Sequence, residues 1–382
     1  MKNSFIALFA CTTLFFLLNA LGLFEFRSFI DRNHRARFVR ERVEGVRAAP
    51  DVVRIAFAYD ASDIPTREAA EGVMLAAELR NAERGNGAPR IELIVRDDAS
   101  TLPKFASAIQ DFCDDASVAA VIGPFVSGQI PAARALTQFH GMPLVSPITV
   151  RSEKLPPLDA DNFVTFFPRL EQWTAAMLDR MEATGHKNVV LVSPEPGTYG
   201  DIFSTALERE IRLRGGQLFR LNYQVPFRRK KISQTIGNYI GGKFADTVFF
   251  GGTYNDFPEL EALLEERGID LPIYGSDALF VPQIFAAKKR NPLFLPEAEI
   301  TPSREDFREL FEKRYGNAPS YQAVLGAETL FAIADALAVP ADYEPDALVE
   351  TLKTASDELQ KRVRIRIVEL HGSSEQLTVN NE

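Results

Sequence analysis

From Val52 onward the chain alternates short apolar runs with amphipathic stretches. The amphipathic stretches carry apolar residues at the i, i+3, i+4, i+7 spacing of one helical face, as at Ala70, Val73, Met74 and Ala77. The apolar runs have the length and the turn-residue borders of buried strands. The strands expected in this first series are 52–58, 91–95, 118–122 and 144–145. Short apolar strands separated by single helices predict a parallel sheet with helices on both faces.

A second series of the same kind follows. Its expected strands are 189–192, 217–221, 247–250 and 273–274, and a last strand is expected at 363–370. Helices are expected at 258–266, 304–315, 321–337 and 345–354. The order of these elements predicts an α/β protein with two doubly wound parallel-sheet lobes.

The N-terminus has the features of a leader. Residues 3–24 carry no charged side chain, and Lys2 precedes them. Such a run is about long enough to span a bilayer, which takes ~20 residues. We therefore expect residues 1–25 to be a signal peptide or a retained membrane anchor. Ala20-Leu21-Gly22 offers small residues for signal peptidase cleavage. Leu8-Phe9-Ala10-Cys11 is similar to a lipoprotein box, but most apolar residues follow it.

An arginine-rich segment, 26–50, lies between this leader and the first expected strand. Its arginines are Arg27, Arg32, Arg35, Arg37, Arg40, Arg42 and Arg47. The positive-inside rule would place such a segment on the cytoplasmic side, which conflicts with export. Two interpretations stay open for it: a solvated spacer, or an arginine-rich helix that lies on anionic lipid headgroups.

Composition and charge narrow the function classes. The chain has 382 residues, of which 46% are hydrophobic and 25% charged, a profile typical of a globular protein with two domains. The net charge is -9, and the only dense basic run, 228–231, is short. Nucleic-acid-binding proteins require an extended basic face, so we expect no nucleic-acid partner.

The sequence contains no pattern typical of catalysis or of a cofactor. The histidines are scattered, and there is no Gly-x-Ser-x-Gly, no phosphate loop, no Gly-x-Gly-x-x-Gly after a strand and no His-Glu-x-x-His. Cys11 lies in the leader, so Cys113 is the only thiol of the folded part and is expected in the core. We expect a non-enzymatic protein without cofactor or metal.

Residues that follow the expected strands are the candidate ligand contacts, because ligands of open α/β sheets bind beyond the carboxyl ends of the strands. Ser127, Thr149 and Thr253 offer hydroxyls there, Tyr199 and Tyr254 offer aromatic faces, and Asp277 offers a carboxylate. A zwitterionic amino acid needs such a mixture. The alternative is that these residue types follow strands because turns and helix caps require them.

Several of these segments resemble one known family. They are Val121-Ile-Gly-Pro-Phe-Val-Ser127, Pro143-Leu-Val-Ser-Pro147, Tyr199-Gly200, Phe249-Phe-Gly-Gly252, Tyr274-Gly-Ser-Asp277 and Phe311-Glu-Lys-Arg-Tyr-Gly316. Their order and spacing, from about Val52 to about Leu337, resemble the type I periplasmic binding proteins of the branched-chain amino-acid and amide (leucine-binding-like) group. The resemblance implies two lobes joined by crossing hinge strands. The expected ranges are 51–168 and 299–344 for lobe 1, and 169–298 and 345–382 for lobe 2.

The resemblance also implies roles for individual residues. Ser127 matches the serine that meets the ligand carboxylate, and Ile148 and Thr149 lie in the loop that supplies further groups to it. Tyr199 matches the tyrosine that covers the ligand, and Asp277 matches the acidic residue that takes its ammonium group.

The chain departs from the family pattern at some of these positions. The hydroxyl of Thr149 is one place off in its loop, and Thr253 stands where an aromatic residue is usual, with Tyr254 next. Arg151 would add a positive charge that suits a more acidic ligand.

The function implied is a solute-binding protein that captures an amino acid or amide for an ABC-type uptake transporter. The alternative is a membrane-anchored ligand-sensing or regulatory module of the same fold. The expected partners are the small-molecule ligand and an ABC permease or a membrane signalling protein. The expected location is periplasmic or extracytoplasmic, with residues 3–24 as a candidate inner-membrane anchor.

Overall fold

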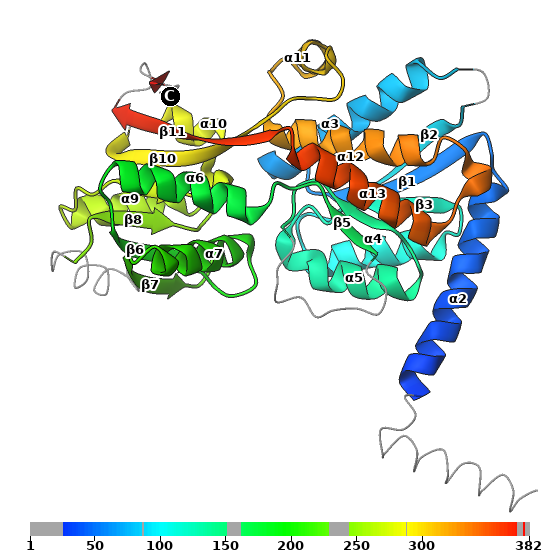
Figure 1. Ribbon diagram of the computed structural model, residues 1–382, viewed down its shortest axis with the longest axis horizontal. Coiled ribbons are helices and arrows are strands. Elements are labelled where there is room, and N and C mark those ends of the chain that lie inside the picture. Colours follow the sequence, from blue (N-terminus) through cyan, green and yellow to red (C-terminus); the bar gives the residue numbers. More distant parts are fainter. Residues whose placement is uncertain are drawn as a thin grey trace, which may run out of the picture.

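The computed structural model describes residues 26–85, 88–150, 162–228, 244–287, 289–372 and 377–378. The expected leader, Arg151 and residues 229–231 of the basic run lie outside these residues. Figure 1 shows two lobes side by side, each built around a sheet, and one long helix that extends from lobe 1. This arrangement confirms the two-lobed α/β fold.

Lobe 1 contains a five-stranded parallel sheet in the order β2-β1-β3-β4-β5. Its strands are β1 (Val52–Tyr59), β2 (Arg90–Asp97), β3 (Val118–Ile122), β4 (Leu144–Ser146) and β5 (Phe163–Thr165). Ile55 and Phe57 face one layer of helices, whereas Ala56 and Ala58 face the other. Both faces of the sheet are therefore covered, as the continuous apolar runs predicted. The first layer is α3 (Ile64–Ala82), α12 (Tyr321–Ala336) and α13 (Pro345–Gln360), and the second is α4 (Leu102–Asp114) and α5 (Ile130–Phe139).

Lobe 2 contains a seven-stranded sheet in the order β12-β11-β10-β9-β8-β6-β7. Its strands are β6 (Asn188–Pro194), β7 (Gln217–Tyr223), β8 (Thr247–Phe250), β9 (Ile273–Gly275), β10 (Lys289–Ile300), β11 (Val363–Gly372) and β12 (Leu377–Thr378). On one face lie α6 (Leu170–Ala183) and α7 (Tyr199–Leu213), and on the other α9 (Phe257–Glu266) and α10 (Pro282–Ala286). Lobe 2 is therefore also covered on both faces by helices.

The sheet of lobe 2 is mixed, which the sequence did not predict. β11 runs antiparallel to both β10 and β12. β10 itself was missed because Pro292 and Pro296 interrupt its apolar pattern. Pro296 pairs with Ile367 of β11 but lies beyond the ladder with β9, which involves only Leu293 and Phe294 of β10.

Three segments cross between the lobes. They are 166–169 before α6, 301–306 before α11 (Phe307–Tyr315), and 361–362 between α13 and β11. α13 packs against α12 and β5, both of lobe 1, although the sequence assigned residues from 345 onward to lobe 2. Its apolar residues Leu348, Leu352 and Leu359 are buried in this position, so the chain returns to lobe 2 only at 361–362.

The arginine-rich segment is helix α2 (Phe26–Arg47), and its C-terminal half belongs to lobe 1. The Arg42 side chain is buried, and its guanidinium donates to the carbonyls of Cys113 at 2.7 Å, Asp115 at 3.0 Å and Val118 at 2.7 Å. Val46 is also buried. A solvated spacer is therefore the wrong description of this half of α2.

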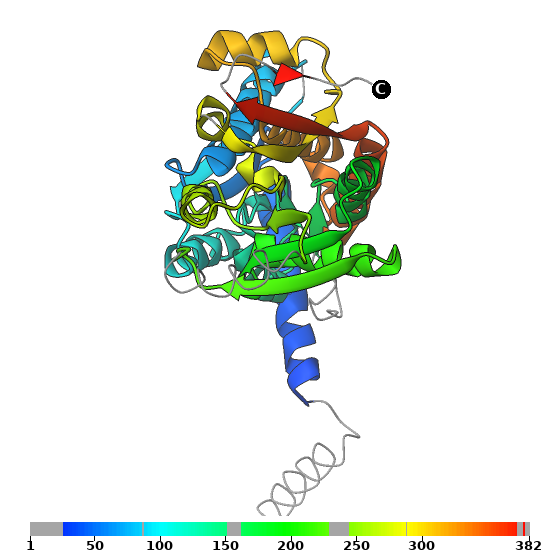
Figure 2. The same cartoon turned by 90° about the vertical axis from the view of Figure 1, so that its left-hand side faces the viewer.

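The N-terminal end of α2 points away from both lobes, on the opposite side from α11 (Figures 1 and 2). Among the helices in the described residues, none combines the length and apolarity that a membrane crossing requires.

Candidate functional site

A buried carboxylate lies between the lobes. Asp277 begins a short 3-10 helix directly after β9, and only 4% of the residue is exposed. Its Oδ1 accepts a hydrogen bond from the hydroxyl of Tyr199, the first residue of α7 in lobe 2. Its Oδ2 accepts one from the hydroxyl of Tyr321, the first residue of α12 in lobe 1. The structure thus brings together Tyr199 and Asp277, two residues singled out by the sequence.

Tyr321 is a third member that the sequence interpretation missed. Tyr321 begins a helix, whereas the expected ligand contacts all follow strands. A signal was available, because Ser320 is an N-cap whose side chain accepts a hydrogen bond from the Ala323 N–H, and Pro319 precedes it.

The electrostatics of this group follow from burial. Burial raises the pKa of Asp277, and the two tyrosine hydrogen bonds oppose that rise. Burial, and then the negative charge of Asp277, raise the pKa values of Tyr199 and Tyr321 well above the ordinary range. Both hydroxyls therefore stay protonated and act as donors. Within the described residues, no lysine or arginine forms an ion pair with Asp277, so its charge is offset only by neutral donors.

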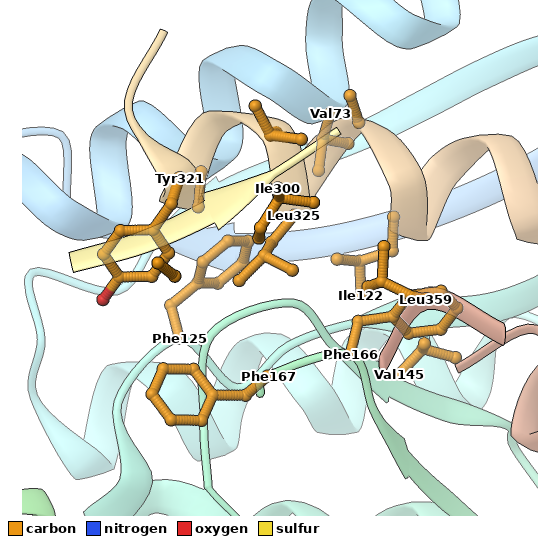
Figure 3. Close-up of a cluster of buried hydrophobic side chains, with 14 of the residues drawn as sticks. Val73, Ile122, Phe125, Val145, Phe166, Phe167, Ile300, Tyr321, Leu325 and Leu359 are labelled. Atoms are coloured by element: carbon orange, nitrogen blue, oxygen red, sulfur yellow. The ribbon is translucent and has the colours of Figure 1, made fainter. Parts of the chain in front are cut away.

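Aromatic rings pack against the two tyrosines that bind the carboxylate. Phe167 of the crossing segment stacks on Trp173 at 5.6 Å between ring centroids, and Tyr199 meets the edge of Phe167 at 5.9 Å. Trp173 also contacts Tyr321 at 5.7 Å. In Figure 3 the Tyr321 ring lies near Phe125, with its hydroxyl directed away from the apolar cluster. The site therefore combines a low-polarity wall with one acidic group, a setting that favours a cation.

The expected carboxylate-binding residues lie on lobe 1 after β3 and β4. Ser127 is buried at the start of a short 3-10 helix, and Gly128 beside it faces the carbonyl of Gly197 in lobe 2. The hydroxyl of Thr149 donates to Ser146 Oγ at 2.7 Å, so its proton is used inside its own loop. Ile148 packs against the core cluster. Ser127 therefore lies next to a residue that faces lobe 2.

Thr253 and Tyr254 lie apart from the Asp277 group. Thr253 is exposed, and its carbonyl accepts from the N–H groups of Asp256 and Phe257 at the start of α9. The hydroxyl of Tyr254 donates to Oδ1 of Asp63, the N-cap residue of α3 in lobe 1, at 3.2 Å. Tyr254 therefore links the lobes at a second place.

A cavity of about 570 Å³ adjoins this region. Its walls come from lobe 1, the 166–169 crossing, α7 and α13, and they include Val150, Phe163, Phe167, Ile202, Ala206 and Ser356. Charged side chains stand at its border, among them Arg169 and Asp357, whose ion pair measures 2.8 Å. The cavity shares Phe167 with the aromatic wall, but none of the seven residues expected from the sequence lines it. The buried carboxylate is the more specific chemical feature, because a buried charge requires a partner.

The described residues contain no group of three or more His, Cys, Asp or Glu side chains able to hold a metal ion. Cys113 is buried, as expected, and burial raises the pKa of its thiol to about 12. At the site itself, the groups that the structure brings together interact by hydrogen bonds to a carboxylate.

Comparisons with known proteins agree with this architecture. A family model described as periplasmic binding protein matches residues 58–365. No curated protein matches the chain. The fold is similar to the Desulfitobacterium hafniense ABC transporter substrate-binding protein in complex with Leu, at 21% identity and TM-score 0.66, covering 84% of this chain and 97% of that one. It is also similar to a Thermotoga maritima leucine-binding protein, at 18% identity and TM-score 0.70, covering 85% and 96%.

A third solved structure shows another ligand on the same fold. It is the Rhodopseudomonas palustris solute-binding protein in complex with 3,4-dihydroxybenzoic acid, at 16% identity and TM-score 0.62, covering 79% of this chain and 85% of that one. At these identities the likeness establishes the fold. The family model spans most of both lobes, and the chain belongs to the periplasmic binding protein family.

Proposed function

We propose that this chain is a solute-binding protein that captures an amino acid or amide between its lobes for an ABC-type uptake transporter. Proteins of its family bind solutes, and the family implies an extracytoplasmic location. The observation that carries the proposal is Asp277, a buried carboxylate between the lobes whose partners in the described residues are neutral hydroxyls. A ligand ammonium group would supply the missing positive charge.

The remaining parts of such a ligand have candidate partners as well. Its carboxylate, or the carbonyl of an amide, would meet Ser127, which precedes Gly128, the residue that faces Gly197 of lobe 2. An apolar side chain would extend along Phe167 toward the 570 Å³ cavity. The relative in complex with Leu supports this class of ligand. The relative in complex with 3,4-dihydroxybenzoic acid shows that the fold also accepts a carboxylate without an amine, so the amine must be tested directly.

The mechanism would be closure of two lobes about three crossing segments. A ligand that contacts Asp277 on lobe 2 and Ser127 on lobe 1 gains both contacts only when the lobes are together, so it shifts the equilibrium toward the closed form. A permease would then distinguish the closed, loaded form from the open one.

We also propose that the protein works at the membrane surface, held there by residues 3–24. Arg42 fixes α2 to lobe 1, so a membrane segment in front of α2 would be coupled to that lobe through a helix. Arg37 and Arg40 are exposed on α2 and would face anionic headgroups. The alternative function, a membrane-anchored sensing module, would use the same docked helix. Retention of the full chain in membranes after an alkaline carbonate wash would support the anchor, and release would contradict it.

Calorimetric titration of the full chain in detergent tests the ligand class. Leucine, valine, leucinamide and the deaminated analogue 4-methylpentanoate form the panel, and Asp277→Asn is the matched variant. We expect amine-bearing ligands to bind the wild type and to lose at least about tenfold in affinity in Asp277→Asn, because a charge-assisted hydrogen bond is lost. Equal binding of leucine and 4-methylpentanoate by the wild type would contradict the proposal.

A further inference from the structure

Tyr321 and Asp277 form a hydrogen bond that crosses from one lobe to the other. Tyr321 is held rigidly in lobe 1, because α12 packs against α3 at two glycines. A Cβ at Gly326 would lie 2.0 Å from the carbonyl oxygen of Ala69, and one at Gly72 would lie 1.9 Å from that of Ala323. Packing as close as this leaves α12 no freedom to slide, so Tyr321 moves with lobe 1 as a whole.

Asp277 is held equally firmly in lobe 2. The N–H of Leu279 donates to the Ser276 carbonyl at 3.1 Å, and the N–H of Phe280 donates to the Asp277 carbonyl at 2.9 Å. Tyr199 is also in lobe 2, so its hydrogen bond to Asp277 persists when the lobes separate. The two tyrosines therefore differ: Tyr199 is a permanent partner of the carboxylate, whereas Tyr321 reaches it only in the closed arrangement.

When the lobes close without a ligand, the Tyr321 hydroxyl takes up acceptor capacity of Asp277 that a ligand could use. Each carboxylate oxygen accepts one hydroxyl, so two of its roughly four acceptor sites are taken, and an ammonium group that approaches from the cleft competes with the Tyr321 hydroxyl that crosses it. An ammonium group is the stronger partner because it carries a charge. The net free energy of its binding to Asp277 is nevertheless reduced by that of the Tyr321 hydrogen bond that it displaces.

We propose that Tyr321 is a specificity-determining residue that acts as an internal competitor. In the ligand-free protein its hydroxyl occupies Asp277 across the cleft, holds the lobes together and takes the place of a ligand ammonium. This rests on the proposed function in one respect only, namely that the ligand carries an amine. Ligands without an amine do not contest Asp277, so Tyr321 sets how strongly the protein prefers amine-bearing solutes.

Tyr254 offers a matched control. Its hydroxyl also crosses the cleft, to Asp63, but Asp63 caps α3 and is not part of the Asp277 group. Tyr254→Phe therefore weakens closure without freeing Asp277, whereas Tyr321→Phe does both. Each variant removes one hydroxyl and keeps the aromatic ring, so both are expected to fold, which thermal unfolding checks.

Two readouts test the inference on the full chain in detergent. The first is the ratio of affinities for leucine and 4-methylpentanoate. We expect Tyr321→Phe to raise this ratio about tenfold, the equivalent of one hydrogen bond to a charged group, and Tyr254→Phe to leave it unchanged. If the wild type binds leucine and Tyr321→Phe does not change the ratio, the competitor role is wrong and the proposed function stands.

The second readout needs no ligand. Spin labels at Lys104→Cys in lobe 1 and Asp270→Cys in lobe 2, both exposed, report the distance between the lobes in a Cys11→Ser background, with Cys113 buried. We expect the ligand-free Tyr321→Phe protein to populate label distances that the wild type does not. An unchanged distance distribution overturns the cross-lobe role, even if no amino acid binds and the proposed function fails.

Discussion

Arg42 of α2 donates a 2.7 Å hydrogen bond to the carbonyl of Val118, the first residue of β3. The same guanidinium reaches two further carbonyls at the end of α4, so one side chain joins the N-terminal helix to the edge of the lobe 1 core. Burial lowers the pKa of Arg42, but guanidinium groups stay protonated in proteins. Its charge is therefore met by three carbonyl dipoles.

Arg42→Ala should destabilise the protein strongly. It leaves three carbonyls without their donor and opens a cavity under α2, and we expect a loss of about 3 kcal/mol in the free energy of unfolding. Chemical denaturation measures it, with Arg40→Ala as the control because Arg40 is exposed on the same helix and should cost less than ~0.5 kcal/mol. Equal effects of the two substitutions would show that α2 is not anchored through Arg42.

The sequence could predict the parallel strands because covered sheets need continuous apolar runs, and β1, β3 and β8 have them. It could not predict β10, where two prolines hide the strand, nor the lobe to which α13 belongs. The apolar face of α13 shows that the helix packs against something, but not against which lobe.

The sequence could likewise predict some residues of the site and not others. Tyr199 and Asp277 follow strands and are adjacent to the cleft for that reason, so a rule about strand ends finds them. The sequence did not reveal the roles of Tyr321 and Arg42, because each residue lies in a pattern that usually indicates a different role. Tyr321 looks like a core aromatic at a helix start, and Arg42 stands in a run of arginines that is typical of an exposed helix.

The contact between α3 and α12 gives a second test of rigidity in lobe 1. Gly326→Ala would place a Cβ 2.0 Å from the Ala69 carbonyl oxygen, which forces the helices apart and should cost about 3 kcal/mol of stability. Gly85→Ala is the control, because a Cβ there meets no atom within 4 Å. Thermal unfolding compares the two. A Gly326→Ala protein as stable as the control would mean that α12 shifts freely, and Tyr321 with it.

The pH dependence of stability should reveal Asp277. Burial raises its pKa in the folded protein above the ordinary 3.8, so the folded state binds a proton more readily than the unfolded state does. The contribution of Asp277 to stability is thus present below pH 3.8 and is lost as the pH rises through the raised value. In Asp277→Asn, which cannot titrate, we expect higher ligand-free stability than the wild type at neutral pH and a difference that shrinks on acidification.

Denaturation midpoints measured between pH 3.5 and 8 test this expectation. Asp306 provides the contrast, because its hydrogen bonds with Arg304 lower its pKa, so its contribution is lost as the pH falls rather than as it rises. A wild-type minus Asp277→Asn difference that does not vary with pH would mean that Asp277 titrates normally.

The cavity beside Phe167 predicts which ligands the protein prefers. Ala206 of α7 lines it, so Ala206→Phe should fill part of the 570 Å³ without touching the Asp277 group. If the ligand side chain enters this space, the affinity for leucine should fall roughly tenfold or more, since overpacking costs about 1–3 kcal/mol, whereas alanine should bind as before. Ala206→Ser adds little volume and serves as the control in the same calorimetric titrations. An equal loss for leucine and alanine would mean that the substitution disturbs closure itself and that the side chain binds elsewhere.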